Sequence, residues 1–110
     1  MSTEQFVAYV GDPQIHDGRV TAVRESAGAL VVEIRSAEGD TIIIKFSGVI
    51  EVRSNRPVGM LLYSLSELEA PRPGRLFVFV NWDDDDDAFL EVKSLEIQVR
   101  KDSGSARDAV

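Results

Sequence analysis

The sequence contains no cysteine and a single histidine, so it is short of the side chains that most often bind metals or attack substrates. Without cysteine there is no disulfide, no thiolate metal site and no cysteine nucleophile, which fits the reducing cytosol. Any histidine chemistry has to run through His16. Residues 1–5 have no basic region and no long apolar stretch, so we expect no signal peptide and a cytoplasmic protein.

Long hydrophobic runs and basic clusters are also missing. The uncharged apolar runs are short, as at Ile42–Ile44, and we expect no membrane-spanning segment. The formal net charge is −7, and five of the acidic side chains stand together at residues 83–87. Nucleic-acid binding usually begins with a basic patch that displaces counterions from phosphates. We therefore expect neither a nucleic-acid partner nor binding to an anionic membrane.

Alternation of apolar and polar residues dominates what is present. The chain of 110 residues has the size of one domain, and we assign residues 1–101 to it and expect residues 102–110, which are small and polar, to form a disordered tail. A period of two, typical of half-buried strands, runs through residues 30–34 and 42–52. A short link containing Gly39 predicts that the two segments form a hairpin.

Four further segments predict strands, and the first of them is a short one at residues 6–10. Residues 19–25 and 75–82 predict strands, and the second of these is apolar on both faces, so we expect it to be central and covered by a helix. In the last strand, residues 89–100, the apolar positions change parity, which predicts a β-bulge at Lys93–Ser94.

The segment 57–69 allows two interpretations. Its apolar residues fall on one face of a helix, after a proline suited to a first turn, and this spacing predicts the single helix of the fold. The alternative is a strand through Met60–Leu65 with a break at Gly59. We expect an α+β, mostly β fold: a strongly bent antiparallel sheet, or a partly open barrel, with one short helix.

His16 and Asp17 form the first candidate site. A general base needs an orienting carboxylate and a pocket, but adjacent residues of an extended chain point to opposite sides, so Asp17 is poorly placed to orient His16. A metal site would need more ligands, of which Asp12 is the nearest, and we predict neither a metal nor a cofactor. The alternative is that the pair hydrogen-bonds nearby backbone and fixes a turn.

The acidic run is the second candidate. It lacks the glycine and the ligand spacing of a calcium loop, so we expect a solvated hairpin turn, with weak cation binding or a partner-binding surface as alternatives. A negative patch can steer a basic partner. Trp82 directly precedes the run; its strand parity favours the core, whereas exposure would make it an interface anchor. The candidate partner-binding residues are Trp82, Asp83, Asp84, Asp85, Asp86 and Asp87.

The order of several short motifs resembles a loose group of small bacterial domains. These motifs are His16-Asp17 at the start of a strand, an alternating hairpin, Phe46–Val49, and a late strand with residues 90–92. Some members of this group look like immunity proteins of polymorphic toxin systems. The resemblance spans about residues 15–99, and Gly18 departs from the alanine or serine expected there. It implies a β-rich, non-enzymatic binding fold and names no partner.

Three functions follow from these observations. The first is a non-enzymatic protein-binding module, in its sharpest form an immunity-like inhibitor of a basic toxin. The second is a self-associating domain, in which Val31, Ile43 and Val49 on the outward parity pair two sheets in a homodimer. The third is a metal-binding or hydrolytic protein centred on His16. Because the chain has no nucleophile-elbow, phosphate-loop or dinucleotide motif, we favour a non-enzyme.

Overall fold

The computed structural model describes residues 6–11, 13–71, 74–83 and 85–102, and these form one antiparallel sheet of seven strands. In space the strands follow the order β1-β5-β6-β7-β4-β3-β2. One 3-10 turn, η1, joins the first two strands of the chain. The elements are β1 (Phe6–Tyr9), η1 (Pro13–Ile15), β2 (Arg19–Ser26), β3 (Ala29–Arg35), β4 (Thr41–Asn55), β5 (Leu62–Leu68), β6 (Arg75–Asn81) and β7 (Phe89–Asp102).

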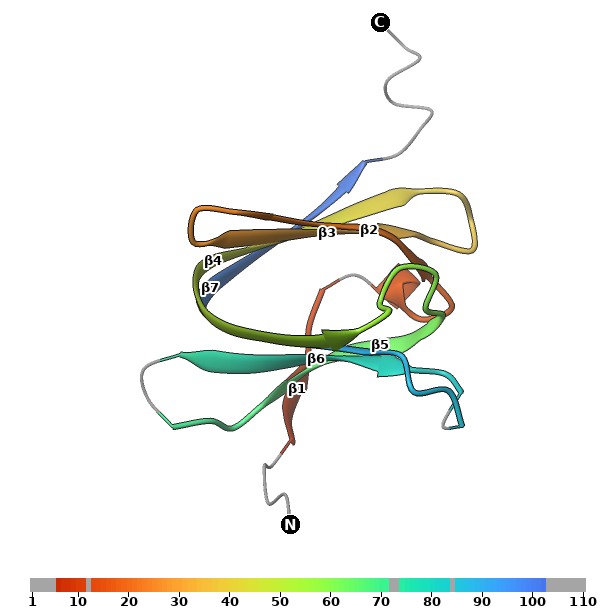
Figure 1. The fold of residues 1–110 in the computed structure, drawn as a ribbon. Helices are drawn as coiled ribbons and strands as arrows, with labels where there is room; N and C mark the ends of the chain where they lie inside the picture. The colour runs from red at the N-terminus through yellow and green to blue at the C-terminus, as the bar shows by residue number, and fades with distance from the viewer. Residues whose placement is uncertain (1–5, 12, 72–73, 84, 103–110) are drawn as a thin grey trace, which may run out of the picture.

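The sheet folds over itself into two layers because its two longest strands belong to both (Figure 1). The first half of β4 pairs with β3, and its second half runs beside the part of β7 that pairs with β6. The bend in β4 lies at Gly48, which has a φ of 62°. The sheet is not closed. At one end, however, the start of β2 meets the start of β5: Leu62 N donates to Gly18 O at 2.7 Å.

The core lies between the two layers. Phe46 of β4 contacts two rings of β6, with centroids 5.4 Å from Phe77 and 6.0 Å from Phe79. These rings are surrounded by buried aliphatic side chains: Ile15, Val20, Leu30, Val32, Ile34, Ile42, Ile44, Met60, Leu62, Leu65, Leu90 and Val92. The predicted hairpin supplies many of them, since β3 and β4 pair in register from Ala29↔Ser47 to Arg35↔Thr41. Among the described residues, no helix is both long and apolar enough to cross a membrane.

The mostly β, antiparallel architecture is confirmed, but the predicted helix over residues 57–69 is wrong. Residues 62–68 of this segment form strand β5, so the alternative interpretation correctly predicted a strand, although with other bounds. The cause of the error is a register shift between Leu62 and Ser64, which leaves Tyr63 as an extra residue. An inserted residue changes the face on which later side chains lie. Leu62 and Leu65 are therefore both buried although they stand three apart, which is the spacing of a helix.

The predicted irregularity of the last strand lies where it was expected, but the extra residue belongs to the neighbouring strand. Val49 pairs with Ser94 and Glu51 pairs with Lys93, so Ile50 of β4 is the unpaired one. The bulge lies opposite Lys93–Ser94 rather than within β7. The last strand also continues to Asp102, the first residue of the predicted tail; residues 103–110 lie outside the described part of the chain.

Candidate functional site

A tight turn places His16 at the rim of the sheet. Ile15, the last residue of η1, is buried at 2% exposure and anchors the turn in the core. The next residues reverse the chain: Asp17 has a φ of 69°, and Gly18 N donates to Ile15 O at 2.9 Å. A Cβ on Gly18 would lie 2.7 Å from Cγ2 of Ile34 and 3.0 Å from the oxygen of Ile15. This crowding explains why glycine stands where the resemblance led us to expect alanine or serine.

The His16 ring is committed to a backbone group. Its Nδ1 lies 2.9 Å from the carbonyl oxygen of Tyr63. Because a carbonyl only accepts, Nδ1 donates, and in the neutral ring Nε2 is left as an acceptor. Nε2 is 3.8 Å from Oδ1 of Asp17, and that oxygen instead accepts a 2.9 Å hydrogen bond from Trp82 Nε1. Asp17 therefore positions the indole and not the imidazole.

Three rings pack together at this rim. The ring centroids of His16, Tyr63 and Trp82 are 5.2–5.3 Å apart in every pair, and Tyr63 and Trp82 are perpendicular at 89°. The core position favoured for Trp82 is wrong, since its exposure is 43%. Strand β6 ends at Asn81, and its buried face is the one occupied by Phe77 and Phe79, not the face of Val78 and Val80 with which Trp82 had been grouped.

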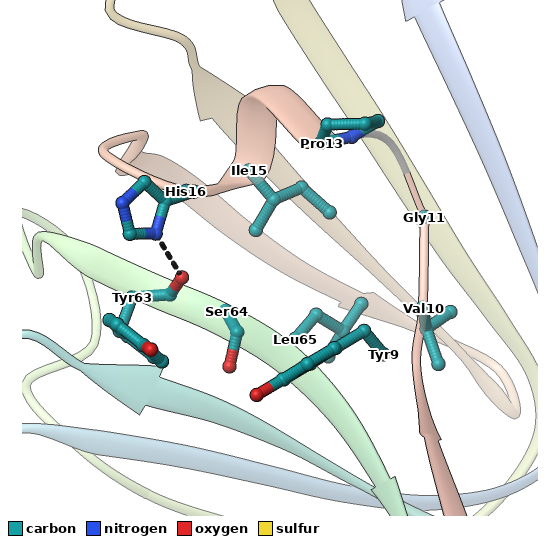
Figure 2. Close-up of a pocket in the computed structure, with 9 residues that line it drawn as sticks. All are labelled: Tyr9, Val10, Gly11, Pro13, Ile15, His16, Tyr63, Ser64 and Leu65. Atoms are coloured by element: carbon teal, nitrogen blue, oxygen red, sulfur yellow. Dashed lines mark hydrogen bonds between the residues drawn. The ribbon is translucent and has the colours of Figure 1, made fainter.

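A pocket of about 350 Å³ opens between η1 and β5, beside the ring cluster (Figure 2). Ile15 and Leu65 give it an apolar interior, while the rings of Tyr9 and Tyr63 lie on either side of Ser64 at its mouth (Figure 2). The Ser64 hydroxyl lies 3.2 Å from that of Ser66. Since His16 bonds to a carbonyl and Ser64 to another serine, the arrangement does not pair a nucleophile with a base.

The acidic run forms a hydrogen-bonded turn directly after Trp82. Asn81 organises it: its Oδ1 accepts from Asp83 N at 2.9 Å, and its Nδ2 donates to Asp86 Oδ2 at 3.2 Å. Asp86 Oδ1 also accepts from Ala88 N, and the Asp86 carboxylate faces Arg56 at 3.5 Å. Asp87 contacts the same guanidinium. Asp84 lies outside the described residues.

The charge state of this turn follows from these bonds. The hydrogen bond from the Asn81 side chain, followed by that from the Ala88 backbone, holds the pKa of Asp86 below its ordinary value. A carboxyl whose pKa is lowered by folding stabilises the fold above its ordinary pKa, and this contribution is lost as the pH falls through the lower folded value. Within the described ranges, no group of three or more histidine and acidic side chains could hold a metal ion.

Asn81→Ala is expected to raise the pKa of Asp86 toward its ordinary value, because the first cause of its lowering is removed. Carbon-detected NMR titration of the aspartate carboxyls measures this directly. Asn55→Ala is the matched control: Asn55 also bonds to the turn, through Asp87 O, but does not touch the Asp86 carboxylate. An unchanged Asp86 titration in Asn81→Ala would contradict the assignment.

No family model matches the chain, and neither the curated proteins nor the solved structures show a significant similarity to it. The structure brings together His16, Asp17 and Trp82, which the sequence had placed in two separate candidate sites.

Sequence reasoning missed both tyrosines of this region. The composition could have pointed to them, because rings with a polar group are rare in this chain: it has two tyrosines, one tryptophan and one histidine. All four side chains lie in the ring cluster or line the adjoining pocket. Such amphipathic rings are frequent at interfaces because they offer an apolar body with a polar handle.

Proposed function

We propose that this protein is a non-enzymatic protein-binding module that holds a basic partner at its aromatic–acidic end. That end is made of His16, Asp17, Tyr63, Trp82, Asp83 and Asp85–Asp87. An immunity-like inhibitor of a basic toxin is the sharpest form of the proposal, and the resemblance noted above points the same way.

The observation that carries the proposal is a pair of exposed but fixed aromatic rings. Tyr63 and Trp82 are 42% and 43% exposed, yet the indole is held by Asp17 and each ring packs against the other and against His16. Binding costs less entropy when the contacting side chains are already ordered. Tryptophan and tyrosine are also the residues most enriched among interface hot spots.

Charge at the same end favours a basic partner. Asp83 and Asp85 follow the indole and are exposed, and the Asp83 carboxylate accepts a hydrogen bond from Asp85 N at 2.9 Å. Arg56 offsets part of the negative charge through Asp86 and Asp87. Such a patch raises the association rate of a basic partner more than it slows dissociation, and salt screens it.

A hydrolytic or metal-dependent function centred on His16 has less support. The hydrogen bond of its ring goes to Tyr63 O, and Asp17 is engaged with Trp82. Asp12, the third residue of that hypothesis, lies outside the described residues.

The test uses the protein to select binders from a random peptide display library. We expect selected peptides to be enriched in lysine and arginine around an apolar anchor, and to change the emission of Trp82, the only tryptophan. Calorimetry with one synthetic selected peptide should show that Trp82→Ala weakens binding by about 30-fold, the effect of a hot spot of about 2 kcal/mol.

Two charge variants test whether the acidic residues affect the association rate rather than the dissociation rate. Asp85→Asn should slow association and reduce its salt dependence with little change in the dissociation rate. Glu38→Gln, an exposed acidic residue in the β3–β4 turn, is the control and should leave both rates unchanged. Selected peptides without basic enrichment, or equal binding to Trp82→Ala, would refute the proposal.

A further inference from the structure

The pocket beside the ring cluster occupies a break in the edge of β5. Strand β1 follows this edge as far as the hydrogen bond from Val10 N to Leu65 O, at 2.9 Å. The chain returns to the same edge where Asp17 N donates to Leu62 O at 2.9 Å. Between these two bonds it runs through η1, and the pocket opens there. Because only residues 63 and 64 of β5 lie in this break, it is too short to pair with an added strand.

Aromatic rings form the two walls of the pocket mouth. Tyr9 and Tyr63 stand on either side of Ser64, and the hydroxyl groups of Tyr9 and Ser64 point into the gap between the rings (Figure 2). Ile15 and Leu65 line the deeper part. The gap therefore offers apolar contact on both sides together with hydroxyl groups that can donate to a carbonyl. It suits an uncharged ring carried on a backbone whose carbonyls are free to accept.

A proline in a polyproline II segment has this chemistry. The polyproline II backbone makes no internal hydrogen bonds, so its carbonyls stay available. Proline-rich segments bind in grooves lined by aromatic side chains, and little entropy is lost because the free segment is already extended. An amphipathic helix fits less well, since it needs a groove long enough for anchors on several successive turns.

A carboxylate with a fixed position lies next to the pocket. Asp17 Oδ1 accepts from Trp82 Nε1 at 2.9 Å, and it is 3.8 Å from Nε2 of His16, which lines the pocket. The Asp17 side chain is 54% exposed. A lysine or arginine placed here would meet both this carboxylate and the face or edge of an indole.

The spacing of the rings sets the spacing of the two recognised residues. The ring centroids of Tyr63 and Trp82 are 5.2 Å apart, and a polyproline II chain advances about 3.1 Å for each residue. The two rings are thus roughly two residues apart along such a chain. Since the proline lies on the far side of Tyr63, the basic residue is expected about three positions from it.

We propose that the basic partner presents a polyproline II segment, with one proline between Tyr9 and Tyr63 and a lysine or arginine about three residues away, at Trp82 and Asp17. The inference rests on the proposed function, because it takes a basic protein partner as given. It adds the conformation of the bound segment and a second anchor, the pocket, which lies outside the aromatic–acidic end.

Synthetic peptides test the two anchors separately. The probes are two capped peptides of about ten residues, rich in proline, with one arginine placed about three positions after or before a central proline. The tighter of the two should bind with a dissociation constant on the order of 100 µM, measured by calorimetry. Replacing the central proline by alanine, or the arginine by its uncharged analogue citrulline, should each weaken binding by at least about 10-fold.

Variants of the protein locate the proline. Tyr9→Ala should weaken binding of the tighter peptide by at least about 10-fold, and Tyr9→Phe, which removes only the hydroxyl, by about 3-fold. Tyr9 is 67% exposed, so neither change should disturb the fold. The matched control is Val7→Ala in the same strand: Val7 is 50% exposed and does not line the pocket, and binding should stay within about two-fold of wild type.

NMR with ring-labelled tyrosine places the peptide directly, because the chain has only two tyrosines. Nuclear Overhauser contacts from the central proline to both rings are expected, and their absence in a bound peptide would overturn the inference. Failure of both peptides to bind, or equal binding by wild type and Tyr9→Ala, would overturn it too. If peptides selected from the random library bind through Trp82 but lack proline and tolerate Tyr9→Ala, the proposed function stands and this inference fails. If no basic peptide binds, both fail.

Discussion

Replacing Phe46 by alanine is expected to lower the free energy of unfolding by about 3–5 kcal/mol, the usual cost of deleting a buried phenylalanine ring. Phe46 has no exposed surface, and it projects from the first half of β4 onto Phe77 and Phe79 of β6. These strands belong to opposite layers of the folded sheet. The substitution would therefore leave a cavity at the contact that holds the layers together.

Urea denaturation followed by circular dichroism measures this loss. A domain of this size is typically stable by about 5–15 kcal/mol, so the variant should unfold at a much lower urea concentration than wild type. Val58→Ala is the control: Val58 is apolar but 57% exposed, and its truncation should cost less than about 0.5 kcal/mol. Similar losses in the two variants would show that the layers do not depend on the ring of Phe46.

Gly18→Ala is expected to cost about 2–3 kcal/mol, although it adds a single methyl group. The new Cβ would lie 2.7 Å from Cγ2 of Ile34 and 3.0 Å from the backbone oxygen of Ile15. Ile34 is fully buried, so it has little freedom to move away. Overpacking of this kind costs about 1–3 kcal/mol, and the backbone contact places this site in the upper part of that range.

A second substitution identifies the contact responsible. Ile34→Leu moves the branch from Cβ to Cγ at constant volume, which removes Cγ2 and by itself costs less than about 1.5 kcal/mol. In the double variant with Gly18→Ala the total loss should be smaller than the sum of the two single losses. Strict additivity in urea denaturation would contradict the steric explanation. The emission of Trp82 should also change in Gly18→Ala, because Asp17, the adjacent residue, holds the indole.

The hairpin of residues 29–47 could be predicted because its alternation is regular and its register is set by a short link. Leu30, Val32 and Ile34 are all buried, as their period of two required. The same logic failed where one strand has an extra residue. Tyr63 interrupts the alternation of β5, and the two leucines on either side of it then take a helical spacing.

The candidate site was only partly visible in the sequence. His16-Asp17 and Trp82 were recognised separately. Asp17 and Trp82, which are joined by a hydrogen bond, lie 65 positions apart in the sequence, and no local pattern connects them. The outward positions chosen for a homodimer, Val31, Ile43 and Val49, are half-buried, and Val49 packs against the core. Leu76, Val78 and Val80 on the outer side of β6, where the sequence had led us to expect a helix, are half-buried as well.

The sequence by itself determined that this chain is mostly β, with a hairpin in its core, because side-chain alternation and turn residues act over short distances. It also determined that the negative charge is concentrated in one turn. Only the tertiary structure decided which face of β6 is buried, and that His16, Tyr63 and Trp82 share one rim. Those outcomes depend on how a bent sheet brings strands from distant parts of the chain together, and the pattern within a single strand carries no information about that.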